Sequence, residues 1–197
     1  VNRFTANGQF TVPATGTYRI TAIGPGGDGG NSYYNSSNGY RNSGGGGGSG
    51  GVAVLTAALS KGEVYPVTVS TAQCSFGSLI SATTGKAGDY TPGGAGGTAA
   101  GGDTNFSGNY GENGKAEMNA VSGGGGAGYT EEQIATVPAL SFTGGAGGDE
   151  TPSDGADVPG AGWSSAGLGG GGAGCDRSAR SGGTGGNGAV IIELVLE

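Results

Sequence analysis

The side chains best suited to binding chemistry lie in one tract, NSYYNSSNGYRN at 31–42. Tyrosine offers rigid contact area at low entropic cost, while asparagine and serine supply adaptable hydrogen bonds, a mixture typical of binding loops. We predict that this tract contacts a partner; packing of its rings over the body of the protein or between subunits is the alternative. The residues assigned to this site are Tyr33, Tyr34, Asn35, Tyr40 and Arg41.

Further aromatic, amide and basic side chains stand in or beside the other stretches that are poor in glycine. An arginine guanidinium can pair with a carboxylate or an anionic sugar, which makes the basic residues useful in the same role. Each aromatic ring has packing as its alternative use. The additional candidates for binding are Asn109, Tyr110, Tyr129, Trp163, Arg177 and Arg180.

One acidic stretch offers the best oxygen ligands for a cation. Calcium takes six to eight oxygens, and closely spaced carboxylates with glycine turns can supply several of them. The spacing does not match the EF-hand pattern, so a solvated acidic loop is the preferred interpretation and no metal or other cofactor is expected. The carboxylates concerned are Asp149, Glu150, Asp154 and Asp157.

Catalytic motifs are not found in the sequence. The chain has no histidine, which removes histidine-based triads, histidine metal sites and the usual general base near neutral pH. Gly85-Lys86-Ala87 resembles part of a phosphate-binding loop but lacks the serine or threonine that follows the lysine. A binding or structural protein is therefore predicted rather than an enzyme.

Charge excludes two kinds of partner. The formal net charge is −7, whereas nucleic acids and anionic membrane surfaces select clustered Lys and Arg. No apolar run reaches the ~18 residues needed for a membrane-spanning helix. Val1 enters strand-like sequence at once, which suggests a processed product or a fragment of a longer protein. Cys74 and Cys175 either form one disulfide or are two unrelated thiols.

Hydrophobic residues gather in runs of strand-like alternation. Residues 9–12 and 17–23 read as a hairpin around the turn Pro13-Ala14-Thr15-Gly16. The other predicted strands are 52–59, 64–70 (with Pro66 marking an edge or a bulge), 75–82 and 189–196. No amphipathic helix is expected beyond one turn at 131–135.

Glycine supplies 51 of the 197 residues, in seven tracts where Gly-Gly-x recurs, as in GGAGGT at 93–98 and GGTGGN at 182–187. An extended left-handed helix of the polyproline II type has three residues per turn. Two glycines in three would let such helices pack closely, and the third residue would point outward or cap the packing. Flexible linkers are the alternative, but seven of them do not fit an ordered chain.

These observations predict a single all-β domain over 1–197. Strands from both chain ends would form a small β-sandwich that clamps a bundle of polyglycine II helices, with little or no α-helix. Because glycine buries no side chain and loses the most backbone entropy on folding, dense backbone hydrogen bonding or oligomerisation must offset that cost.

Several segments resemble the glycine-rich domains of tail fibre proteins from tailed phages and prophages. They include QFTVPATGTYRITAIGPGGDGG at 9–30, GGGGGSGGVAVLTAALSKGEVYPVTVS at 44–70, SFGSLISATTGKAG at 75–88, GGAGGTAAGGDTNFSG at 93–108 and GGTGGNGAVIIEL at 182–194. The resemblance is weaker over 109–166. Related architecture is known from polyglycine-bundle phage adhesins and from the glycine-rich extracellular region of anaplastic lymphoma kinase.

The resemblance implies a distal receptor-binding module on a virion tail fibre, acting outside the host cell on a glycan or an outer-membrane protein. It implies a homotrimer joined to other fibre or baseplate chains, and it transfers no catalytic or fixed binding residues. The alternatives are a structural fibre or trimerisation module that binds no receptor, and an ice-binding protein. An extracellular animal signalling module would be expected to have more cysteines.

Overall fold

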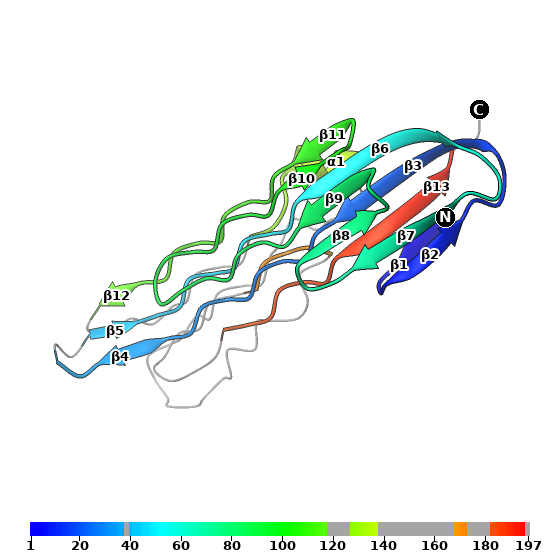
Figure 1. The fold of residues 1–197 in the computed structure, drawn as a ribbon. Coiled ribbons are helices and arrows are strands. Elements are labelled where there is room, and N and C mark those ends of the chain that lie inside the picture. The colour runs from blue at the N-terminus through cyan, green and yellow to red at the C-terminus, as the bar shows by residue number, and fades with distance from the viewer. Residues whose placement is uncertain (38–39, 118–126, 138–167, 173–181, 196–197) are drawn as a thin grey trace.

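The computed structural model describes residues 1–37, 40–117, 127–137, 168–172 and 182–195 (Figure 1). Two antiparallel sheets form a sandwich, glycine-rich segments run away from it side by side, and a small third sheet lies at the far end. The predicted all-β class is confirmed. The helix of the described part is the short α1 (Glu131–Thr136).

The first sheet joins the two ends of the chain, as predicted. The first strand of the chain pairs with the last one, and the last one also pairs with the strand Gly16–Ile23. In spatial order its strands are β1 (Asn2–Phe4), β13 (Ala189–Leu194), β3 (Gly16–Ile23), β6 (Val52–Leu59) and β11 (Thr104–Phe106). The second sheet is built from β10 (Ala99–Ala100), β9 (Ile80–Thr83), β8 (Gln73–Phe76), β7 (Val64–Val69) and β2 (Gly8–Thr11).

The sandwich core lies between these two sheets. Phe10 packs edge-on against Tyr18 with ring centroids 6.0 Å apart, and Tyr65 stacks on Phe76 at 4.7 Å. Aliphatic side chains of both sheets fill the remaining space. Cys74 is a free thiol with no exposed surface, so the proposed disulfide is not formed at this residue.

The predicted hairpin of 9–12 with 17–23 is wrong. Strand β2 pairs with β7 in the second sheet, whereas β3 pairs with β6 and β13 in the first. The turn at 13–16 therefore crosses from one sheet to the other. Alternation shows only which face of a strand is buried, and both sheets of a sandwich bury an inner face.

Two further predictions about strands need correction. The segment 75–82 is not one strand, because β8 and β9 form a hairpin whose turn contains Gly77 at φ 54°. Strand β7 is not an edge, since it lies between β8 and β2. Its Pro66 is tolerated because the β7–β8 ladder starts only at Val67, and the Pro66 carbonyl accepts from Gly77 N at 2.8 Å.

The glycine-rich segments that run from the sandwich to the third sheet are here called the glycine body. They are organised around segment 43–51, which is buried throughout. Its amides donate in three directions with a step of three residues. Gly45, Gly48 and Gly51 donate to Asp89, Lys86 and Thr83 respectively, at 2.8–3.0 Å. The amides of 46 and 49 donate to the segment 108–115, and those of 47 and 50 to 169–172. A step of three is the periodicity of the predicted extended helices.

The carbonyls of segment 43–51 accept in three other directions with the same step. Gly24, Gly27 and Gly30 donate to the carbonyls of 51, 48 and 45 at 2.7–2.8 Å. Each neighbouring segment is also hydrogen-bonded to the next, so that six segments close a ring around the central one. In order around the ring these are 24–30, 83–89, 91–98, 108–115, 127–129 and 169–172.

Close approach of backbones explains why the central segment consists mainly of glycine. A Cβ on Gly47 would lie 2.0 Å from the carbonyl oxygen of Gly27, and one on Gly50 would lie 2.0 Å from that of Gly24. Both distances are far inside van der Waals contact, and the obstacle in each case is backbone. Glycine is therefore required at these positions for lack of space rather than for conformational freedom.

Two of the third residues of the repeat cap neighbouring amides. At the edge of segment 24–31, Asp28 Oδ1 accepts from Gly185 N at 2.9 Å and Asn31 Oδ1 accepts from Gly182 N at 3.1 Å. These side-chain oxygens occupy the place that a backbone carbonyl takes elsewhere in the body. Side chains thus complete the hydrogen bonding at the edge of the glycine body.

Candidate functional site

The tyrosine-rich tract forms the end of the molecule farthest from the sandwich (Figure 1). Its strands β4 (Tyr33–Asn35) and β5 (Tyr40–Asn42) pair antiparallel, and β12 (Ala116–Glu117) adds to β5. We call these three strands the tip. The sequence reasoning placed binding residues in this tract but did not foresee that it is a sheet.

Register places the predicted residues opposite one another across the tip. Tyr34 pairs with Arg41, and Arg41 pairs with Glu117 on the third strand. In the neighbouring pair, Asn35 stands opposite Tyr40. The tip therefore brings together all five residues assigned to the tract, with a cationic and an anionic residue type in one cross-strand row.

The glycine body holds the tip through both of its strands. Segment 24–31 leads into β4 and segment 43–51 leads out of β5, and the two are joined by the three-residue hydrogen-bond series described above. Every one of those bonds is formed by backbone, so the support depends little on side-chain rotamers. This construction gives the tip a rigid base.

Ser43 fixes the base of the tip, and the sequence analysis did not single it out. Its side chain is buried, its Oγ donates to the carbonyl of Lys115 at 3.1 Å, and the same oxygen accepts from Lys115 N at 2.7 Å. Its amide also donates to the Lys115 carbonyl. The strand β12 is thereby held against β5. The available signal was a serine that starts a run of five glycines.

Two other candidates form hydrogen bonds within the glycine body. Tyr129 is 4% exposed, and its hydroxyl donates to the carbonyl of Gly50 at 2.9 Å. Burial raises the pKa of this phenol above its usual range. Asn109 Nδ2 donates to the carbonyl of Gly128 at 2.8 Å and to Gln133 Oε1 at 3.3 Å. Tyr129 therefore has the packing role that was its alternative, and the partly exposed Asn109 uses its side-chain amide within the glycine body.

Tyr129 takes the place of a backbone donor in the hydrogen-bond network of the glycine body. The carbonyl of Gly47 accepts from Ala127 N at 2.9 Å, and three residues later the carbonyl of Gly50 accepts from the Tyr129 hydroxyl. The phenol thus replaces the backbone amide that would continue this series. The following helix α1 is anchored by a capping box between Thr130 and Gln133, a pattern visible in the sequence as TEEQ.

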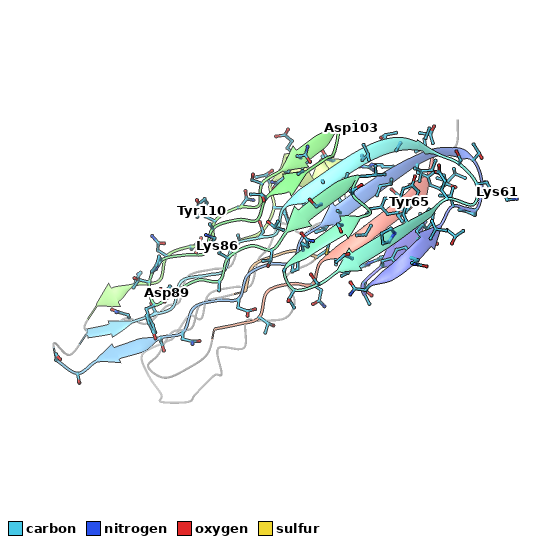
Figure 2. The ribbon with its side chains drawn as sticks, viewed as in Figure 1. Lys61, Tyr65, Lys86, Asp89, Asp103 and Tyr110 are labelled. Atoms are coloured by element: carbon cyan, nitrogen blue, oxygen red, sulfur yellow. The ribbon has the colours of Figure 1, made fainter. Side chains whose placement is uncertain are left out.

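The remaining candidates are separated from the tip or lie outside the described residues. Tyr110 is 75% exposed and stands on the flank of the glycine body, between the sandwich and the tip (Figure 2). The described part of the chain contains no group of three or more residues suited to hold a metal ion. Outside that part lie Trp163, Arg177, Arg180 and the four carboxylates Asp149, Glu150, Asp154 and Asp157.

Comparison with known proteins adds no family to this description. The chain matches none of the protein-family models, and it has no match among curated protein sequences. Within the described residues, no helix has the length and apolar character required to cross a membrane.

Proposed function

We propose that the chain is a receptor-recognition module of the kind found at the distal end of phage tail fibres. The observation that carries this proposal is the position of the tip. Val1 and Leu194 lie at the sandwich end, and the tip with its tyrosines, asparagines and arginine lies at the opposite end (Figure 1). An attachment through either end of the chain would leave the tip free to meet a receptor.

The composition of the tip supports recognition without covalent chemistry. Its strands contain three tyrosines, two asparagines and one arginine, residue types that combine large contact area with adaptable or bidentate hydrogen bonds. We infer as well that the glycine segments are left-handed three-residue helices, which the step of three in their hydrogen bonds supports. In this proposal they are the frame, and the tip is the recognition surface.

The proposal is tested by binding of the fluorescently labelled chain to bacteria that carry defined surface mutations. A variant with Tyr33, Tyr34 and Tyr40 all changed to Ala should lose cell binding while its melting temperature stays near that of the parent. The matched control is Tyr110→Ala, which removes an exposed ring from the flank and should retain binding. Full binding by the triple variant would overturn the assignment of the tip.

Failure of the parent chain to bind any cell would favour the alternative, a structural fibre module. Light scattering on the same sample would test the expected trimer. A trimer that binds no cells would point to assembly and spacing as the role of this chain. A monomer that binds cells would support the proposed recognition role and would contradict the expected trimer.

A further inference from the structure

The outer face of the second sheet carries a hollow of about 400 Å³ that the proposed function does not use. Strands β8, β9 and β10 form its floor, with Gly77 and Leu79 from the turn between β8 and β9 beside them. Its volume falls within the range of about 300–1,000 Å³ typical of small-molecule sites.

Small residues in register explain why the hollow exists. Ser75 on β8 pairs with Ser81 on β9, and Ser81 pairs with Ala100 on β10. Side chains of alternate residues lie on opposite faces of a sheet, and the core side chains Cys74 and Ala82 occupy the inner face. The three small residues therefore stand in one row on the outer face, where they leave a trough across three strands.

The hollow is lined by neutral polar side chains that keep their hydrogen-bonding capacity. Ser75 is 9% exposed at its floor, and its hydroxyl has no hydrogen-bond partner among the described residues. The same holds within the described chain for the side chains of Gln73, Ser78 and Ser81. Serine hydroxyls and glutamine amides can both donate and accept. No charged residue contributes to the lining.

From this lining we propose that the hollow binds a neutral saccharide unit. Sugar hydroxyls both donate and accept, which matches the serine and glutamine side chains. Their C–H faces match the apolar surface of Leu79 and Ala100 at the same hollow. An anionic ligand would find no cationic partner in the lining and would meet a chain of net charge −7. The site is on the sandwich and is separate from the tip.

The test is a two-dimensional NMR titration of the intact chain with glucose, galactose and N-acetylglucosamine, and with glucuronate as the charged comparison. For at least one neutral sugar, the amides of Ser75, Ser81 and Gly101 should shift, with a Kd on the order of 1 mM, a standard free energy of about −4 kcal/mol. Glucuronate should leave them unchanged.

Ser75→Val removes the hydroxyl from the floor of the hollow and adds a methyl group in its place, and it should abolish the shifts. Thr68→Val, which changes the residue opposite Ser75 on β7 and outside the hollow, should retain them. Ser81→Val makes the same change on the next strand of the floor, so that a folding defect in one variant leaves the other as the test.

Absence of shifts with every neutral sugar, or shifts in Ser75→Val and Ser81→Val equal to those of the parent, would overturn the proposed saccharide site. Cell binding by the tip is measured separately and does not depend on these results. Loss of cell binding in the tyrosine variant together with an unresponsive hollow would therefore refute this site alone.

Discussion

Substitution of Gly47 by Ala tests the packing of the glycine body most directly. The added Cβ would lie 2.0 Å from the Gly27 carbonyl oxygen, and ordinary contact begins at 3.4 Å, so the two segments must separate by about 1.4 Å. The amides of 24, 27 and 30 donate across this contact at 2.7–2.8 Å. A separation of that size breaks these three bonds.

Each such bond contributes about 1 kcal/mol net, so Gly47→Ala should lower the free energy of unfolding by roughly 3 kcal/mol. For a chain of this size the melting temperature should fall by about 6–12 °C. Urea denaturation followed by circular dichroism measures the change.

The control is Ala95→Ser, which also adds one heavy atom but at a half-exposed third position of the repeat GGAGGT. Its effect should stay within about 0.5 kcal/mol. The packing argument is refuted if Gly47→Ala costs no more than Ala95→Ser.

Three further predictions concern individual hydrogen bonds and one thiol. Tyr129→Phe leaves the buried Gly50 carbonyl without its donor and should cost about 1–3 kcal/mol in urea denaturation; an unchanged midpoint would contradict the role of the phenol in the lattice. Asp28→Ala removes the cap from Gly185 N and should speed hydrogen exchange at that amide, while amides bonded only to backbone in segment 43–51 keep their rates. Burial raises the pKa of the Cys74 thiol from 9.0 to about 11, so the unfolded chain loses this proton at lower pH than the folded one. The stabilisation of the folded chain by the protonated, buried thiol is therefore complete below pH 9 and is lost as the pH rises to 11. The unfolding free energy should fall by about 2–3 kcal/mol more in the parent than in Cys74→Ala over this interval, and equal slopes would contradict the buried thiol.

Local sequence pattern predicted strand positions better than strand partners. The run 52–59 matches β6 residue for residue, because a nearly continuous apolar run between a glycine tract and the turn at Lys61-Gly62 marks a buried strand. Partners depend on which sheet a turn enters. Nothing in Pro13-Ala14-Thr15-Gly16 distinguishes a hairpin turn from a crossing between sheets, so β2 was assigned to the wrong neighbour.

The period of the glycine tracts was also readable, since Gly-Gly-x shows directly which two positions of three must lack a Cβ. The order in which the segments surround 43–51 could not be predicted from the sequence, because every tract has nearly the same composition. Tyr129 is a second example of a role that the sequence alone could not predict. A tyrosine in a stretch poor in glycine reads as a binding residue, and only the packed lattice reveals that one acceptor lacks a backbone donor.

The central position of segment 43–51 has a consequence for how the protein folds. Its six neighbours come from stretches between residues 24 and 172, and the strand that closes the first sheet begins at residue 189. Almost none of the ring is local in sequence, so loop-closure entropy must be overcome before most of its hydrogen bonds form. Chains dominated by such contacts fold slowly. During synthesis, the central segment has one of its six neighbours until residue 83 is made, and the ring is complete only after residue 172 has been made.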